Sequence, residues 1–338
     1  MKRSLSLEVL VDAADRQAAL ERDVRLGLTA PAKSVPPVWF YDEVGSRLFD
    51  EITRLPEYYP TRAERSVLAE RAAEIVAMAG ADVLVEIGSG TSDKTRLLLD
   101  AMREAGSLRQ IVLLDISEEV LREAAATLSR DYDVDVHAVV GDFRSDVGAL
   151  AKGEGRLWAF LGSTIGNLMP GPRRRFLADV AEAMADDDHL LLGTDLVKDP
   201  ARLVAAYDDA AGVTAAFNRN LLEVLNRGLG ADFDRRRFEH RAVWDPGEAW
   251  VEMRLRAVEA HEVRLAGLDL AVAFAEGEEI LTETSAKFRP EQVLAELGEA
   301  GLLAVASWQD PAGDVQVTLA RRAASSDGAR VGDAPPSP

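Results

Sequence analysis

A short apolar strand that runs directly into two glycines constrains the fold of this chain more than any other feature. Residues 82–87 read DVLVEI, and Gly88-Ser89-Gly90 follow at once. A strand that breaks at glycines and then enters a helix brings backbone close to a ligand at the carboxyl end of a parallel sheet. We expect that helix to begin with the capping pair Ser92-Asp93. The segment predicts a cradle for a nucleotide-type cofactor.

The charges around these glycines indicate which cofactor the cradle holds. A second apolar strand, residues 111–114, ends in Asp115, and an acid at this point is the usual partner of ribose hydroxyls. A dinucleotide site needs a third glycine, but Asp93 stands there, and its charge would repel a pyrophosphate. Glu86 adds negative charge. A cationic cofactor, S-adenosylmethionine, fits better, and the string E-x-G-x-G resembles motif I of the class I methyltransferases.

Composition excludes several classes of function. The 338 residues include 39 basic and 58 acidic side chains, giving a net charge of −19, which argues against nucleic acid as the main partner. The chain has no cysteine, so disulfides and thiolate chemistry are excluded. The four histidines lack metal-ligand spacing, so we expect no metal. Without a long apolar run or a leader pattern, we expect a cytoplasmic protein that binds no membrane.

The order of the predicted elements indicates an α/β fold. A helix over 62–79, opened by a capping box of Thr61 and Glu64, precedes the glycine motif. Strands alternating with helices are expected at 82–87, 111–115, 135–140, 156–161 and 189–195. This pattern predicts a doubly wound, Rossmann-like parallel sheet. After a helix at 290–302, a hairpin of residues 303–308 and 315–319 would return to the sheet, and such an antiparallel end is typical of class I methyltransferases.

Two further regions interrupt this rhythm and predict a second domain. Residues 9–28 suit an exposed helix, residues 200–227 a helix interrupted near Gly212, and residues 236–275 alternate as strands do. We therefore predict a methyltransferase domain over 62–197 and 288–322, a substrate-binding domain over 9–61 and 198–287, and a disordered tail over 323–338.

Candidate substrate contacts follow the fourth strand and cluster near the N-terminus. Asn167 comes just past a predicted strand end, where its amide could hold a carboxylate or an amine, although it could instead fill a turn or cap the helix after Pro170. Tyr41, Tyr58 and Tyr59 are three of five tyrosines in the chain. Their phenols could hydrogen-bond a substrate amine, with core packing as the alternative for at least one.

A carboxylate and a hydroxyl could meet a ring on a late strand. Glu283 and Ser285 are two residues apart, so on a strand they share a face and could bind both nitrogens of an imidazole. A solvated strand face is the alternative. Tyr207, alone on its helix, is by itself more typical of an amphipathic surface.

Several long strings together resemble a known family. Phe40-Tyr41-Asp42, TRLPEYYPTR over 53–62, LGSTIGN over 161–167, GTDL over 193–196 and Lys287-Phe288 look like the histidine Nα-methyltransferases of ergothioneine biosynthesis. The resemblance runs from about residue 20 to residue 321. It implies trimethylation of L-histidine to hercynine with three molecules of S-adenosylmethionine. Ala286 departs from the family, where Cys precedes the Lys-Phe pair, and we expect that position to serve packing only.

The resemblance also implies roles for individual residues. Those implied to bind the cofactor are Gly88, Lys94, Asp115 for the ribose, and Asp142 with Phe143 for the adenine. Those implied to bind the amino-acid backbone are Tyr58, Asn167 and Tyr207, while Glu283 and Ser285 would bind the imidazole, with Met253 near the ring and Tyr41 near the reacting amine.

Three other functions stay open at this point. They are a methyltransferase for another amino acid such as tryptophan, a nicotinamide-dependent oxidoreductase, and a non-catalytic amino-acid-binding protein on the same scaffold. The pair of Glu283 and Ser285 favours histidine over tryptophan or tyrosine. We expect a monomer whose partner is the small-molecule substrate.

Overall fold

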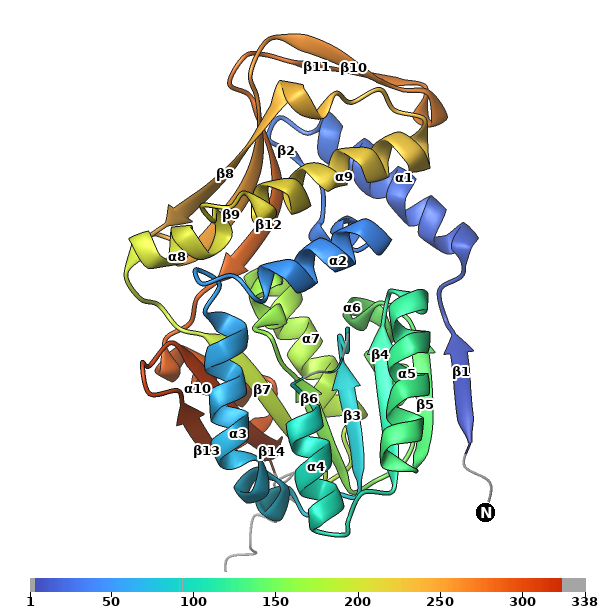
Figure 1. Cartoon of the computed structure of the whole chain (residues 1–338), viewed down its shortest axis with the longest axis vertical. Helices are drawn as coiled ribbons and strands as arrows, with labels where there is room; N and C mark the ends of the chain where they lie inside the picture. Colours follow the sequence, from blue (N-terminus) through green and yellow to red (C-terminus); the bar gives the residue numbers. More distant parts are fainter. Residues whose placement is uncertain (1–3, 91, 93, 324–338) are drawn as a thin grey trace, which may run out of the picture.

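The computed structural model describes residues 4–90, 92 and 94–323 (Figure 1). Asp93, which carried the charge argument above, lies outside the described residues, as does all of the predicted tail except Ala323. Among the described residues, no helix combines the length and apolar character that crossing a membrane requires.

A mostly parallel sheet of eight strands forms the larger layer, in the order β1-β5-β4-β3-β6-β7-β14-β13. Its strands are β1 (Leu5–Val9), β3 (Val83–Ile87), β4 (Gln110–Asp115), β5 (Asp135–Val140), β6 (Arg156–Phe160), β7 (His189–Asp195), β13 (Leu302–Gln309) and β14 (Val315–Arg322). The order reverses beside β3, as in a doubly wound sheet, and β14 and β13 are antiparallel. The predicted fold class is confirmed.

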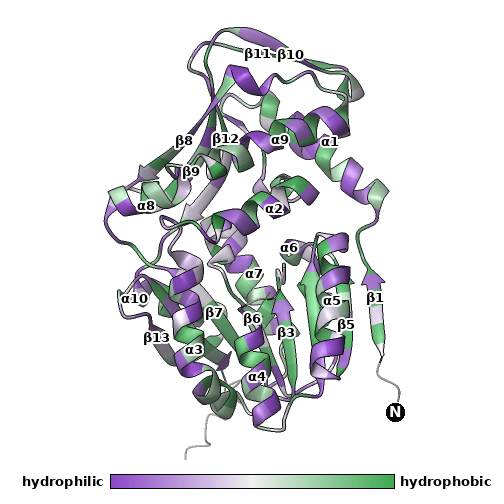
Figure 2. Cartoon of the chain, viewed as in Figure 1, coloured by the Kyte–Doolittle hydropathy of each residue, from purple (hydrophilic) through white to green (hydrophobic). Residues whose placement is uncertain are grey.

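Helices cover both faces of this sheet because its strands are apolar on both sides. On one face lie α3 (Pro60–Ala79), α4 (Arg96–Glu104) and α5 (Glu118–Tyr132), and on the other α6 (Phe143–Asp146), η2 (Val147–Leu150), α7 (Pro170–Ala183) and α10 (Pro290–Glu299). Figure 2 shows mostly hydrophobic strands between helices of mixed character. The two faces bury separate hydrophobic cores.

A second, smaller sheet has the order β2-β12-β9-β8. Its strands are β2 (Lys33–Ser34), β12 (Glu279–Ala286), β9 (Trp250–Ala257) and β8 (Phe238–Asp245), and a separate hairpin pairs β10 (His261–Leu265) with β11 (Leu270–Phe274). The helices of this region are α1 (Ala13–Thr29), η1 (Pro37–Phe40), α2 (Glu43–Ile52), α8 (Pro200–Tyr207) and α9 (Val213–Leu229), with the short turns η4 (Arg235–Arg237) and η5 (Ala266–Leu268). One hydrophobic core joins its N-terminal and C-terminal parts. The domain boundaries given above stay a prediction.

The small sheet is tied directly to the large one where β12 ends. Residues Leu196 and Phe288 form an isolated parallel bridge, in which the Phe288 N–H donates to the Asp195 carbonyl at 2.8 Å and the Val197 N–H donates to the Phe288 carbonyl at 2.9 Å. Figure 1 shows the small sheet and α8 beyond the carboxyl ends of β3 and β7.

Four local expectations were wrong or incomplete. Strand β1, not predicted, pairs with β5, and its alternation of Leu5, Leu7 and Val9 is the pattern that could have revealed it. Helix α1 is not simply exposed, because it buries Leu20, Val24 and Leu28.

The other two concern helix starts. Helix α3 begins at Pro60 without a side-chain cap, since proline suits the first helical position, and Glu64 turns inward instead of capping. Helix α4 begins only at Arg96, beyond the expected Ser92-Asp93 start.

Candidate active site

A cavity of about 910 Å³ lies between the carboxyl ends of the large sheet's strands and the small sheet with α2. The lining from the large sheet's side includes Gly88, Gly90, Lys94, Asp115, Asp142, Phe143, Gly162 and Asn167. The facing side contributes Tyr41, Ser46, Phe49, Tyr58 and Glu283. Open α/β sheets bind ligands at this edge.

The glycine motif forms a bare backbone cradle. Gly88 and Gly90 have φ of +69° and +48°, and a Cβ on either would meet nothing within 4 Å. Both therefore adopt left-handed backbone that favours glycine, beside open space that a ligand can fill.

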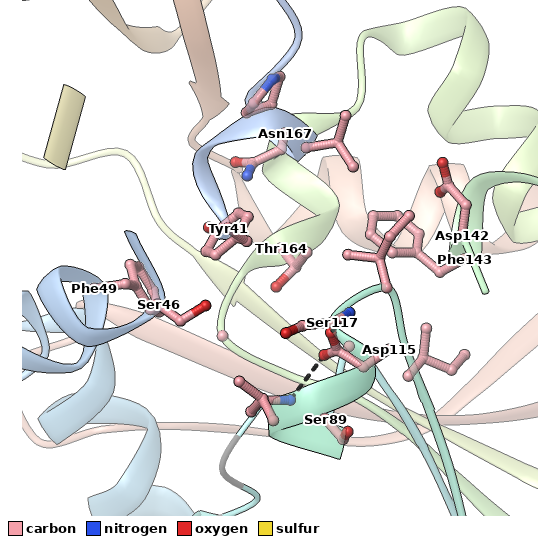
Figure 3. A pocket seen from close by; sticks show the side chains of 18 of the residues that line it. Tyr41, Ser46, Phe49, Ser89, Asp115, Ser117, Asp142, Phe143, Thr164 and Asn167 are labelled. Atoms are coloured by element: carbon pink, nitrogen blue, oxygen red, sulfur yellow. Dashed lines mark hydrogen bonds between the residues drawn. The ribbon is translucent and has the colours of Figure 1, made fainter. Parts of the chain in front are cut away.

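Asp115 lies at the edge of this cradle and accepts hydrogen bonds from two backbone N–H groups, and Figure 3 shows its position. Its Oδ2 accepts the Gly90 N–H at 2.9 Å, and its Oδ1 accepts the Ser117 N–H at 2.9 Å. Burial raises the pKa of the Asp115 carboxyl, while these backbone donors oppose the rise. A carboxylate fixed in this way can accept hydrogen bonds from a diol such as ribose.

Asp142 and Phe143 follow the next strand and form another part of the wall. Asp142 caps α6 by accepting the Arg144 N–H at 2.9 Å, and it pairs with the Arg144 guanidinium. The Phe143 ring packs against Phe160 and Phe176, with centroids 5.3 and 5.6 Å away. The result is an aromatic surface beside a fixed acid, which suits an adenine ring.

Lys94 lines the cavity and is held by an ion pair with Glu64, which the sequence did not predict. Its ammonium pairs with Glu64, whose side chain is 2% exposed. The Gly162 N–H donates to both oxygens of Glu64, at 2.8 and 2.9 Å. The spacing of Thr61 and Glu64 indicated a cap, and no local pattern distinguishes a cap from this long-range contact.

Glu86 is less negative than the sequence suggested. Burial raises its pKa to about 7, although the hydroxyls of Ser92, at 2.6 Å, and Thr95 both donate to its carboxylate. At neutral pH this group therefore carries less negative charge than an ordinary exposed glutamate.

The opposite wall of the cavity carries Glu283, a buried acid whose side chain forms no hydrogen bond with the described residues. Its residue is 8% exposed, and within residues 4–90, 92 and 94–323 no hydrogen bond to its side chain is formed. Burial raises the pKa of Glu283 to about 7, and the positive charge of Lys287 opposes the rise. A buried carboxylate with free oxygens fits a ligand that brings a hydrogen-bond donor.

Aromatic side chains surround the space between Asp115 and Glu283. The ring of Phe49 lies 5.7 Å from that of Tyr41 and 6.2 Å from that of Tyr58. Tyr59 turns away and donates to Asp195 at 2.8 Å, so it belongs to the interior. Asn167 lies in η3 (Thr164–Asn167) and does not cap α7, whose N-cap Met169 has no side-chain bond. Asn167, Tyr41 and Thr164 all line the cavity, and Figure 3 labels the three.

Three predicted substrate residues, Tyr207, Ser285 and Met253, are buried and do not line the cavity. Tyr207 is buried, not on an amphipathic surface, and its phenol donates to Ser285 Oγ at 2.8 Å. Met253 is 2% exposed and pairs with Glu283 across β9 and β12. Of the residues named from sequence, the cavity thus brings together Gly88, Lys94, Asp115, Asp142, Phe143, Tyr41, Tyr58, Asn167 and Glu283.

Comparison with known proteins identifies the family. A family model described as "Histidine-specific methyltransferase, SAM-dependent" matches residues 20–322. The chain is 59% identical to a histidine N-alpha-methyltransferase of Mycolicibacterium smegmatis over 94% of this chain and all of that protein. It is 56% identical to the Mycobacterium tuberculosis histidine N-alpha-methyltransferase, over 90% of this chain and 95% of that one.

A more distant relative has a name that refers to a pathway. The "Ergothioneine biosynthesis protein 1" of Neurospora crassa is 31% identical over 64% of this chain and 26% of its own length. The family match covers the small sheet, every strand of the large sheet except β1, and every residue named above as lining the cavity. This chain belongs to the S-adenosylmethionine-dependent, histidine-specific methyltransferases.

Proposed function

We propose that this protein trimethylates the α-amino group of L-histidine to hercynine, as a step of ergothioneine biosynthesis. The similarity to two histidine N-alpha-methyltransferases over nearly the whole chain supports the activity. The observation that carries it is the free carboxylate of Glu283, buried in the wall opposite the glycine cradle, where an imidazole N–H would find an acceptor.

The cradle side fits S-adenosylmethionine through this chain's own residues. Asp115 would accept the ribose hydroxyls, Asp142 and Phe143 would hold the adenine, and Lys94 would pair with the carboxylate of the methionine part beside the open backbone of Gly88. When bound, the cofactor supplies a methyl group on a positively charged sulfur.

The facing side fits a free amino acid. Tyr58 and Asn167, which line the cavity, would hold its carboxylate and amine, and Glu283 would hold its ring. Tyr207 would assist the first pair and Ser285 would assist Glu283 from just behind the lining, with Met253 packed beside them. Holding the amine at a fixed distance from the donor is worth roughly 7–11 kcal/mol. Aromatic walls from Tyr41, Phe49 and Tyr58 suit the quaternary cation that a third methylation produces.

Tyr41 is the group proposed to handle the amine proton. Burial and the negative charge of Glu283 raise the pKa of Tyr41 well above its usual value. The phenol therefore stays protonated at neutral pH, and its role is to orient the amine or a water and to pass a proton along, not to act as a phenolate base.

Mass spectrometry of the products tests the proposal. Incubation with L-histidine and S-adenosylmethionine should give gains of about 14, 28 and 42 mass units, which are successive CH₂ increments of an alkylated amine. Tryptophan and tyrosine in the same panel test the other amino acids, and a titration with NAD and NADP tests the oxidoreductase alternative. Methylation of another amino acid without methylation of histidine would refute the assignment. A cytoplasmic, monomeric enzyme stays a prediction.

A further inference from the structure

A fully buried lysine lies behind the part of the cavity wall that carries Glu283. The side chain of Lys287 is 0% exposed, and its ammonium has three acceptors. It donates to Tyr207 Oη at 2.8 Å and to Ser285 Oγ at 2.8 Å, and it pairs with Asp195 Oδ2 at 3.0 Å. Lys287 thus makes two hydrogen bonds to hydroxyls and one ion pair to a carboxylate.

The two hydroxyls that accept from Lys287 also bond to each other. Tyr207 Oη donates to Ser285 Oγ at 2.8 Å. Ser285 Oγ therefore accepts twice, once from Lys287 and once from Tyr207, and both of its lone pairs are occupied. The Ser285 hydroxyl can only donate to a further partner.

Ser285 shares a strand face with Glu283, which lines the cavity, so the side of β12 that carries the ring site is open to its remaining proton. The β12–β9 register is regular from Glu283 to Ala286, so Glu283 and Ser285 lie on the same face of β12. No described residue accepts the Ser285 proton. The wall thus offers an acceptor at Glu283 and a donor at Ser285, which is the complement of a neutral imidazole with one N–H and one bare nitrogen.

We propose that Lys287 is a positioning residue that makes Ser285 a hydrogen-bond donor and so selects a substrate ring carrying an unprotonated nitrogen. This inference rests on the proposed function and names how the site distinguishes histidine. A ring with an N–H but no bare nitrogen, such as an indole or a pyrrole, leaves a buried donor without a partner. An imidazolium brings a second N–H to a hydroxyl that has no lone pair left.

The structure supplies a matched control. Lys198 pairs with the other oxygen of Asp195 and donates to Tyr59 Oη at 2.8 Å, but it does not contact Tyr207 or Ser285. Lys287→Met therefore leaves Asp195 paired with Lys198 and Tyr59, and Lys198→Met leaves it paired with Lys287. Only the first change frees lone pairs on the two hydroxyls.

The test compares binding of L-histidine with binding of the 2-yl and 3-yl pyrrolylalanines, which keep one ring N–H and lack the second nitrogen. Calorimetric titration is done with S-adenosylhomocysteine present, so that no turnover occurs. The wild-type protein should prefer histidine by about 30-fold, Lys287→Met should reduce this preference to about fivefold or less, and Lys198→Met should preserve it.

Several outcomes decide the matter. An unchanged preference in Lys287→Met, or an equal loss in Lys198→Met, overturns the role of Lys287. If Lys287→Met does not fold, Ser285→Ala takes its place, and a full preference retained there overturns the inference as well. Wild-type protein that neither binds nor methylates histidine refutes the proposed function together with this inference. Wild-type protein that methylates histidine while Lys287→Met keeps its preference refutes only the inference.

Discussion

Gly193 and Glu64 share one space in the interior, because a Cβ built on Gly193 would lie 2.0 Å from Glu64 Oε1. The glycine on β7 thus makes room for the carboxylate that receives the Gly162 N–H and pairs with Lys94. The absence of a side chain at Gly193 therefore lets Glu64 hold Lys94 at the cavity.

Gly193→Ala should therefore weaken both the fold and the cofactor site. The methyl group would displace Glu64, at a cost of about 1–3 kcal/mol of unfolding free energy. Chemical denaturation should show the loss, and titration should show weaker S-adenosylmethionine binding. Gly298→Ala is the control, since a Cβ there meets nothing within 4 Å and alanine suits a helix better. A Gly193→Ala protein as stable as wild type would contradict the shared-space argument.

Glu283→Ala should weaken histidine binding by about 1–3 kcal/mol, because the imidazole N–H loses a charged acceptor. Calorimetric titration with histidine measures the change. Glu279→Ala on the same strand is the control, since Glu279 pairs with Arg254 and Arg241 and does not line the cavity. Unchanged histidine affinity in Glu283→Ala would remove Glu283 from the site.

Glu283→Gln should stabilise the ligand-free protein in a pH-dependent way. Burial raises the pKa of Glu283 from an ordinary 4.5 to about 7, so the folded state holds this proton more tightly than the unfolded chain. The wild-type protein therefore loses stability as pH rises between these values, by up to about 3 kcal/mol. The glutamine variant should not lose this stability, because its side chain does not ionise.

Unfolding of both proteins across the pH range checks this expectation. Their stabilities should agree near pH 4.5, and the variant should be the more stable one near pH 8. Glu86 also titrates near pH 7, but it is present in both proteins and cancels in the difference. A difference that does not change with pH would show that Glu283 is not buried as an acid.

Tyr41→Phe should lower the rate of methyl transfer by about 100-fold or more, the lower end of the range for loss of a proton-handling group. Single-turnover measurements with each of the three acceptors, unmethylated, monomethylated and dimethylated histidine, separate chemistry from binding. Affinity for S-adenosylmethionine is the internal control and should stay within about twofold. Full trimethylation at the wild-type rate would exclude the phenol as an essential relay.

The parallel sheet was predictable because its strands are continuous apolar runs that end in glycines or acids. The site residues at those ends, Gly88 and Asp115 among them, follow from the same pattern, since strand ends meet at one edge. Strand β1 was missed because five alternating residues near a terminus are a weak pattern.

Contacts between distant parts of the chain were not predictable in the same way. Glu64 resembles a helix cap in sequence, and only the fold shows that its oxygens meet Gly162. The pairing of Asp195 with Lys287 joins two segments whose proximity depends on how the small sheet returns to the large one. No periodicity encodes such pairs, because each residue satisfies its local pattern without the other.

The bridge between Leu196 and Phe288 has a mechanical consequence. The strand that carries Glu283 and Ser285 is anchored by backbone hydrogen bonds to the end of β7, and β6 joins β7 to β3, which leads into the glycine cradle. The residues proposed to bind the amino acid and those proposed to bind the methyl donor are thus connected through one continuous hydrogen-bonded backbone. On such a framework, the distance between the methyl donor and the bound ring depends on the backbone hydrogen bonds of the bridge as well as on the cavity side chains.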